Sequence, residues 1–89
     1  IGAICIAPVM IAKILQNLDR KGKVTGGFNE KILTDIESMG MITEKVNATE
    51  IVIDYENKIV STPAYVEANS IKEVAEGIEK LVDAVLSMV

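Results

Sequence analysis

The pattern of hydrophobic and polar positions divides the chain into short segments, and the first of them is almost entirely apolar. The opening stretch Ile1-Gly2-Ala3-Ile4-Cys5-Ile6 is a continuous run of about six residues with β-branched members, which is typical of a strand buried on both faces. Ala7 and Pro8 end the run, and proline suits the first turn of a helix because its missing N–H would have no intrahelical partner. Residues 9–15 are apolar almost all round, so we predict a helix buried inside a domain.

The middle of the chain alternates polar turns with apolar segments. One apolar stripe at helical spacing predicts a second helix, with Asn29 as its N-cap and Gly40 as its stop. Asn47-Ala48-Thr49 is interpreted as a turn. In chain order, the pattern predicts a strand at 23–25, a turn at 26–29, a helix at 30–39 and a strand at 41–46.

Two strand-like runs follow, at 50–54 and 58–61, joined through Tyr55-Glu56-Asn57. A short polar link with asparagine, which tolerates the left-handed conformation, predicts a β-hairpin. The segment 61–64 is expected to leave the second strand as a loop, because residues before Pro63 avoid the helical conformation.

The last predicted element is a helix that begins with the capping-box sequence Ser70-Ile71-Lys72-Glu73. Apolar positions from Ile71 to Met88 form a stripe about four turns long. Such a helix could bind a partner or lie on a membrane surface, but its polar face is acidic, which argues against anionic lipid. We therefore predict that it packs on the sheet.

Strands that alternate with helices imply a mostly parallel sheet covered on both faces, so the predicted fold class is a three-layer α/β sandwich with a β-hairpin. We interpret residues 1–89 as part of a single domain. The chain starts inside what is predicted to be a central strand, and such a strand needs a neighbour on each side. We therefore expect an incomplete, C-terminal portion of a longer protein.

Charge and composition exclude several classes of function. A net charge of −4 argues against a phosphate-binding surface for nucleic acid. The single cysteine excludes an intrachain disulfide, and the absence of histidine leaves no familiar zinc or haem ligand set, so we predict neither a metal nor a cofactor. The opening apolar run has no basic flank and is interrupted by Pro8, so it is neither a signal peptide nor a membrane span. A reducing, cytoplasmic location is the expectation.

The cysteine, Cys5, falls where the first predicted strand turns into the first predicted helix. A helix N-terminus offers unpaired N–H groups and about half a positive charge, which stabilise a thiolate and could bind an oxyanion formed when sulfur attacks a carbonyl. A nucleophile on a tight strand-to-helix turn is the arrangement of the nucleophile elbow. Free cysteine is also among the most buried residue types, so Cys5 can equally be a small hydrophobic residue of the core. The residues alone leave both interpretations open.

Two weaker features also carry alternatives. Gly26 and Gly27 precede a helix and could cradle an anion, but without the rest of a phosphate motif a plain turn is the preferred interpretation. The carboxylates of Glu50, Asp54 and Glu56 lie close together on the hairpin and could form a general acid/base pair. A solvated, charged hairpin edge is far commoner, and that is what we predict.

Two segments of the chain resemble a known family. The segment Gly2-Ala3-Ile4-Cys5-Ile6-Ala7-Pro8 and the segment 54–65, with its Asn57-Lys58-Ile59-Val60 run and Thr62-Pro63-Ala64, are similar to proteins of the ElbB type. These amidotransferase-like proteins, also known as isoprenoid-biosynthesis, enhancing-lycopene-biosynthesis or sigma cross-reacting proteins, belong with PfpI-type proteases and protein deglycases to the class I glutamine-amidotransferase-like superfamily. The similarity continues through 77–82 and covers about the C-terminal half of the family's length.

The resemblance implies a flavodoxin-like three-layer fold in which Cys5 is the nucleophile and the backbone N–H of Ile6 contributes to the oxyanion site. It also implies a glycine-rich loop and a carboxylate from the other half of the domain, and no residue here matches that carboxylate. Members of the family are associated with glyoxalase-type chemistry, in which a thiol adds to methylglyoxal or glyoxal and a 2-hydroxy acid leaves without an added cofactor. Proteases and amidotransferases of the superfamily use a histidine as base; Ile6 follows the cysteine here and the chain has no histidine, so this segment does not support either activity.

These observations favour a functional thiol at Cys5 and give a leading hypothesis, a glyoxalase-like enzyme that acts on a small carbonyl substrate in the complete protein. The second hypothesis is a redox-sensing or chaperone-like module in which oxidation of the same thiol is the signal. A third is a structural role in a homodimer, since the excess of apolar residues fits a partner subunit as well as a missing half of the domain.

Overall fold

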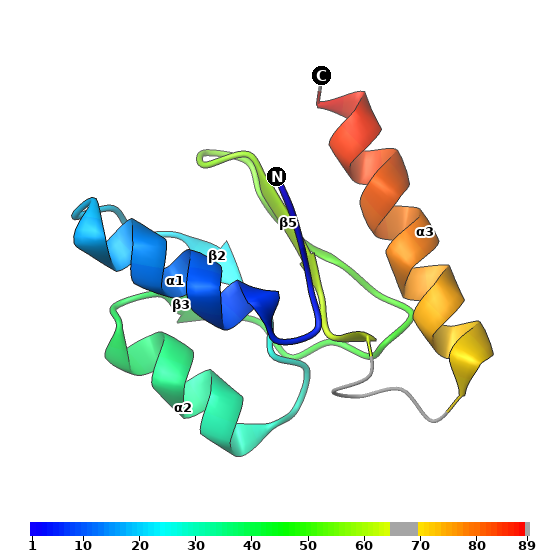
Figure 1. Ribbon diagram of the computed structural model, residues 1–89, viewed down its shortest axis with the longest axis horizontal. Helices are drawn as coiled ribbons and strands as arrows, with labels where there is room; N and C mark the ends of the chain where they lie inside the picture. The colour runs from blue at the N-terminus through cyan, green and yellow to red at the C-terminus, as the bar shows by residue number, and fades with distance from the viewer. Residues whose placement is uncertain (65–69, 89) are drawn as a thin grey trace.

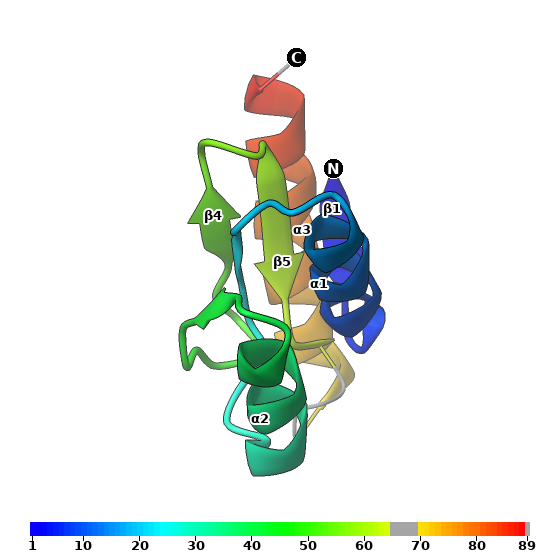
Figure 2. The same ribbon diagram turned by 90° about the vertical axis from the view of Figure 1, so that its left-hand side faces the viewer.

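Helices cover both faces of a small group of strands in the computed structural model, which describes residues 1–64 and 70–88. Helices α1 (Ala7–Asn17) and α2 (Glu30–Ser38) lie on one side of the strands, and α3 (Ile71–Ser87) lies on the other (Figure 1). In Figure 2, α1 and α2 stand in front of the strands and α3 stands behind them. The predicted α/β class, with helices on both faces of a mixed sheet, is confirmed.

The strands form two groups instead of one continuous sheet. A three-stranded sheet has the order β1-β5-β4, and a separate pair is formed by β2 and β3. The five strands are β1 (Gly2–Ile4), β2 (Lys23–Val24), β3 (Ile42–Thr43), β4 (Val52–Asp54) and β5 (Ile59–Thr62). β1 runs parallel to β5, β2 runs parallel to β3, and β4 pairs antiparallel with β5. The predicted hairpin is therefore confirmed.

The predicted capping residues and the predicted terminating glycine bound the helices in the structure. The side chain of Asn29 accepts a hydrogen bond from the Ile32 amide at 3.1 Å, and that of Ser70 accepts one from the Glu73 amide at 3.3 Å, so both predicted N-caps are confirmed. Gly40 follows α2 with φ +86°, as a helix-terminating glycine does. The predicted strand at 41–46 is shorter in the structure, because only the two residues of β3 pair with β2.

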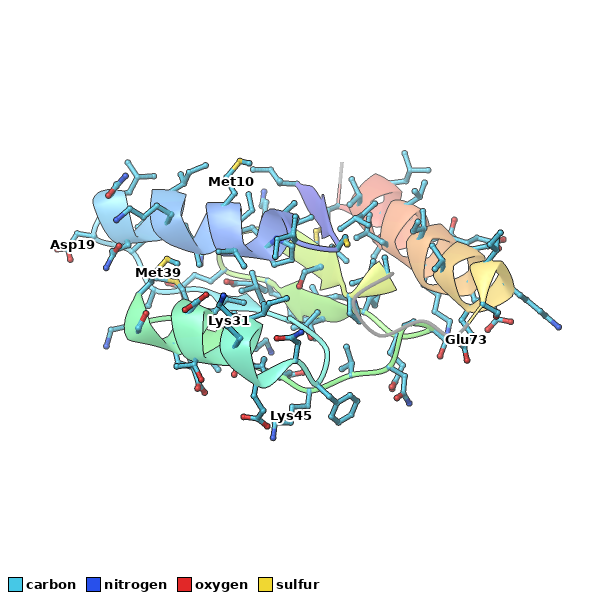
Figure 3. The ribbon with its side chains drawn as sticks, turned by 60° about the horizontal axis from the view of Figure 1, so that its bottom comes forward. Met10, Asp19, Lys31, Met39, Lys45 and Glu73 are labelled. Atoms are coloured by element: carbon cyan, nitrogen blue, oxygen red, sulfur yellow. The ribbon has the colours of Figure 1, made fainter. Side chains whose placement is uncertain are left out.

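The predicted complete burial of the first strand and the first helix is wrong for the chain as described. Ala3 is buried, but Gly2 is exposed and Ile4 is half-buried. The physical reason is that β1 pairs with β5 on one side only, so it is an edge strand. On α1, Met10 is 65% exposed and points away from α2, whereas Met39 lies between the two helices (Figure 3).

One apolar cluster lies between α1, α2 and the strands. It is built from side chains spaced three or four residues apart on the inner face of each helix, which is the spacing that brings side chains to one helical face. Its fully buried members are Ala12, Leu15, Val24, Ile36, Met41 and Ile59. With only one phenylalanine and two tyrosines in the chain, aliphatic and methionine side chains supply this core, as the composition predicts.

Helix α3 packs on the opposite face of the sheet through Val74, Gly77 and Leu81, which are its buried residues. Gly77 permits an unusually close approach, because a Cβ atom there would overlap the backbone carbonyl oxygen of Ala48. The predicted packing of this helix on the sheet is thereby confirmed. In the described part of the chain, none of the helices combines the length and apolar character that a bilayer crossing requires.

Gly77→Ala is expected to lower the free energy of unfolding by about 1–3 kcal/mol, because the added methyl group would force α3 away from Ala48. At an ordinary helical position the same change stabilises by roughly 0.5–1 kcal/mol, so the sign of the effect reports the close contact. Urea unfolding followed by circular dichroism measures it. Glu76→Ala, on the exposed side of the same turn, is the control and should shift stability by no more than about 0.5 kcal/mol.

Candidate active site

Cys5 lies between the end of β1 at Ile4 and the first residue of α1 at Ala7. Its backbone φ is +63°, in the left-handed region that L-residues rarely adopt. Its amide still belongs to the sheet, since it donates to the Thr62 carbonyl oxygen at 3.0 Å. Ile6 already has helical angles, φ −91° and ψ −13°. A single residue therefore makes the sharp turn from strand to helix.

This backbone conformation has a cost. A left-handed conformation at a residue other than glycine costs roughly 1–2 kcal/mol, because Cβ approaches the following carbonyl oxygen. The surrounding structure holds Cys5 in place by the pairing of β1 with β5 on one side and by the start of α1 on the other. A strained residue on a strand-to-helix turn presents its side chain outward from the end of the sheet, which is how an elbow nucleophile is displayed.

The N-terminus of α1 is open next to this thiol. Among the described residues no side-chain hydrogen bond caps this helix, its first turn carries no acidic residue, and Pro8 has no N–H. The amides of Ile6 and Ala7 have no partner within the helix, because the first N–H groups of any helix lack one. The aligned peptide dipoles add about half a positive charge at this end. Cys5 is half-buried and Ile6 is exposed.

The described residues supply no further group to the thiol. Within residues 1–64 and 70–88, Cys5 makes no side-chain hydrogen bond or ion pair. No set of three potential metal ligands is gathered in that part of the chain either. The sequence contains no histidine. In the described part of the chain, the predicted site therefore consists of the Cys5 thiol at the turn and the Ile6 and Ala7 amides that follow it in sequence.

The side chain of Asp54 is buried, whereas we predicted a solvated, charged hairpin edge. It is only 6% exposed, and its carboxylate accepts hydrogen bonds from the Lys23 amide at 2.8 Å and from the Asn57 side chain at 2.9 Å. The Asn57 amide donates a third, at 3.1 Å. Burial alone would raise the pKa of Asp54, but the hydrogen bonds from Asn57 and Lys23 outweigh it and hold the pKa below its ordinary value. This carboxylate ties β2 to the hairpin.

The hairpin carboxylates do not converge on the thiol. Thr62, at the end of β5, lies opposite Ile4, whereas Asp54 pairs with Ile59 at the beginning of β5. Cys5 and Asp54 are thus at opposite ends of that strand. Glu50 accepts from the Asn47 amide at 3.0 Å within its own turn. The hypothesis of a general acid/base pair on the hairpin has no geometric support.

The glycine pair forms a packed turn, as the preferred interpretation predicts. A Cβ atom at Gly26 would overlap the side chain of Ile32, so the turn lies directly against α2. Gly27 has φ +66° and donates its amide to the Thr25 hydroxyl at 3.0 Å. Close packing and turn conformation account for both glycines.

Comparison with known proteins agrees with this architecture. The chain is similar to an isoprenoid biosynthesis protein with an amidotransferase-like domain from Ehrlichia chaffeensis, whose crystal structure superposes with a TM-score of 0.84 at 28% identity. The match covers 99% of this chain and 39% of that one. The chain is also 28% identical over 97 residues to the mitochondrial ES1 protein homolog of Rattus norvegicus, and the match covers 99% of this chain and 35% of that protein. No protein-family model matches.

The superposition confirms the predicted flavodoxin-like, amidotransferase-like fold for the region that this chain covers. The chain spans well under half the length of either relative.

Two groups that shape the site are not predicted by the sequence pattern. The Thr62 carbonyl oxygen accepts a hydrogen bond from the Cys5 amide, and the Asn57 side chain donates one to the Asp54 carboxylate. The spacing of Asp54 and Asn57 was a usable signal, because an Asp side chain commonly accepts from the backbone a few residues onward in a turn. The partner of Cys5 depends on which strands pair and in which register, and no local pattern encodes that.

We expect Cys5→Gly to be more stable than Cys5→Ala by about 1 kcal/mol, because only glycine relieves the left-handed conformation. In a regular strand the order would be reversed. Chemical denaturation of both variants, compared with the unsubstituted chain, measures the difference. An alanine variant as stable as the glycine variant would show that residue 5 is not held at positive φ in solution.

Asp54→Asn is expected to reduce stability by about 1–3 kcal/mol near neutral pH, since the variant loses an ionised acceptor of three hydrogen bonds. The pKa of Asp54 is lowered in the folded chain, so its carboxylate stabilises the fold above the unfolded-state value of about 3.9. That contribution is lost as the pH falls through the lower folded-state pKa. The wild type and the variant should therefore converge in acid.

Urea unfolding of both proteins at several pH values between about 7 and 3 tests this convergence. Glu56→Gln, at an exposed position of the same hairpin, is the matched control and should give only a small difference in stability. A difference between wild type and Asp54→Asn that stays constant down to the lowest pH would contradict the assigned role.

Proposed function

We propose that Cys5 is the nucleophile of a cofactor-independent, glyoxalase-type reaction that converts a 2-oxoaldehyde into a 2-hydroxy acid in the complete protein. The observation that supports this proposal is the positive φ of Cys5 at the turn between β1 and α1, two residues before the first residue of α1. The similarity to an amidotransferase-like domain protein supports a small-molecule carbonyl chemistry at this position. Methylglyoxal and glyoxal are the substrates that we would test first.

The proposed reaction needs a thiolate, an oxyanion site and a proton carrier. The sulfur of Cys5 attacks the aldehyde carbon, and the carbonyl oxygen becomes an oxyanion that the Ile6 amide can stabilise. A base then moves the hydrogen from the former aldehyde carbon to the neighbouring carbonyl carbon through an enediol, which leaves a thioester. Water hydrolyses the thioester, releases the 2-hydroxy acid and regenerates the thiol. The net change is addition of one water molecule, so no external oxidant or reductant is consumed.

In the described residues, the Cys5 thiol makes no hydrogen bond to a group that could act as the base of this reaction. The relatives are much longer than this chain, which matches 39% and 35% of their lengths. We infer that the proton carrier belongs to the remainder of the complete protein and that the 89-residue chain by itself has no turnover. These 89 residues contain no histidine, so they do not themselves supply the partner of a Cys–His pair.

Cys5→Ala in the complete protein is expected to reduce the conversion of methylglyoxal to lactate by on the order of a thousandfold, since the variant loses the attacking atom. Lactate formation, followed by chromatography, is the measurement. Glu76→Ala, on the exposed surface of α3, is the control and should retain full activity. Lactate formation that survives Cys5→Ala unchanged would remove the proposal.

The competing redox-sensing hypothesis predicts a different outcome from the same samples. Mild peroxide would convert Cys5 to a single discrete oxidised species, visible by mass spectrometry, while methylglyoxal would not be consumed. Turnover that depends on Cys5 and is abolished by this oxidation favours the enzyme. Discrete oxidation without turnover in the complete protein favours the sensor.

A further inference from the structure

The parallel ladder between β1 and β5 ends where the chain turns at Cys5. In such a ladder, every second residue of one strand bonds to two residues of the other. The Val60 amide donates to the Ile1 carbonyl oxygen at 2.8 Å, and the Cys5 amide donates to the Thr62 carbonyl oxygen at 3.0 Å. The next bond of this series would run from the Ala64 amide to the Cys5 carbonyl oxygen. Among the described residues that bond is not made, because Cys5 leaves the strand with φ +63°.

The interrupted ladder leaves the Ala64 amide unpaired in a buried residue. Ala64 is 1% exposed, and within residues 1–64 and 70–88 its N–H makes no hydrogen bond. Buried backbone N–H groups almost always have a partner, because an unpaired one loses its bond to water without replacement. The unpaired N–H of Ala64 therefore indicates an acceptor that the described residues do not supply.

The backbone at Ala64 is also strained. Its φ is +48°, so Cys5 and Ala64 both adopt the left-handed conformation just beyond the carboxyl ends of the paired strands β1 and β5. Glycine would adopt that conformation without the steric cost that Cβ adds. The end of β5 is held firmly, since the buried Thr62 hydroxyl donates to the Glu50 carbonyl oxygen at 2.8 Å. Strained residues that the surrounding structure holds in place cluster at functional sites.

The alternation of the ladder directs this donor toward the Cys5 turn. Thr62 lies opposite Ile4 and points its carbonyl oxygen at the Cys5 amide. In an extended segment the N–H of the second residue onward, here Ala64, points to the same side. The carboxyl ends of parallel strands are also where open α/β sheets bind their ligands. Two chain segments thus contribute backbone donors at the turn, Ile6 from the start of α1 and Ala64 from the end of β5.

We propose that the Ala64 amide binds the second carbonyl oxygen of a vicinal dicarbonyl substrate whose first carbonyl carbon is attacked by Cys5. This inference rests on the proposed function and assigns the second oxygen of the substrate. The Ile6 amide stabilises the oxygen on the attacked carbon, and the second oxygen lies one carbon farther from the sulfur. Simple aldehydes have no second carbonyl oxygen, so the pair of donors favours 2-oxoaldehydes over them.

The second oxygen acquires charge during the proposed reaction. When the base removes the hydrogen of the attacked carbon as a proton, the electron pair of that C–H bond forms the enediolate double bond. The π electrons of the neighbouring carbonyl move to its oxygen at the same time. The Ala64 N–H stabilises that oxygen until the base returns the proton to the second carbon.

A stable adduct tests the amide without turnover. Bromoacetone alkylates Cys5 with loss of bromide and the thiol proton, and it leaves a ketone oxygen on the second carbon from the sulfur. Propyl iodide gives an adduct of the same length without that oxygen. In the complete protein carrying isotope-labelled alanine, the Ala64 amide should exchange with solvent at least about tenfold more slowly in the ketone adduct than in the propyl adduct. Ala64→Gly removes this signal and so assigns it.

Cys5→Ser, treated with the same two reagents, is the control and should show no difference between them. Equal exchange rates of the Ala64 amide in the two adducts of Cys5 would overturn the proposal. This outcome is distinct from failure of the proposed function, which is measured by lactate formation in Cys5→Ala and does not enter the adduct experiment.

A backbone ester at residue 64, in which oxygen replaces the N–H, tests the contribution to turnover. It should lower kcat/KM of the complete protein for methylglyoxal by about a hundredfold to a thousandfold, as loss of one oxyanion donor does. The melting temperature should stay within about 2 °C, because no bond within the fold is lost. Ala64→Gly keeps the N–H and should retain most of the activity. An ester variant with full Cys5-dependent activity would overturn the proposal, and so would a strongly destabilised one, whose N–H must be bonded inside the protein.

Discussion

The parallel pairing of β1 with β5 is the interaction on which the rest of the structure depends. It sets Ile4 opposite Thr62 and lets the Thr62 carbonyl hold the Cys5 amide. Because the last bond of the ladder is made by the residue that turns, α1 must start within two residues of the sheet. A shift of this register by one residue would reverse the faces of β1 and move the thiol away from the helix end. The position of Cys5 is therefore a property of strand pairing as much as of local sequence.

A second set of contacts joins parts of the chain that do not share a ladder. The Asp54 carboxylate accepts from the Lys23 amide, and the Asn57 side chain donates to the Lys21 carbonyl oxygen, so both connect the hairpin to the backbone of 21–23. The buried Ser61 hydroxyl accepts from the Thr25 amide at 3.1 Å. These polar links replace the missing ladder between β2 and the main sheet. Because Asp54 and Ser61 are buried and partnered, loss of a partner leaves a buried polar group unsatisfied, which makes this end of the molecule sensitive to single substitutions.

Local chemistry made much of this fold predictable, and long-range pairing limited the prediction. Asn29, Gly40 and Ser70 act through neighbours three or four residues away, so their caps can be identified in a single sequence. The location of Cys5 at a strand-to-helix junction was predictable for the same reason. Its positive φ was not, because cysteine has no preference for that conformation. The burial of Asp54 depends on the approach of residues 21–23 from across the fold, and nothing in its immediate sequence reports that approach.

The left-handed backbone at residue 5 also restricts which reactive side chains this turn can display. A β-branched residue is strongly disfavoured at positive φ, since its second γ substituent crowds the backbone. Threonine, although it carries a hydroxyl, is therefore a poor occupant of the position, whereas serine and cysteine share the single γ atom that the turn tolerates. The backbone conformation thus limits the nucleophile at this position by the shape of its side chain, independently of its acidity. Among hydroxyl side chains, only serine could replace the cysteine without crowding the backbone.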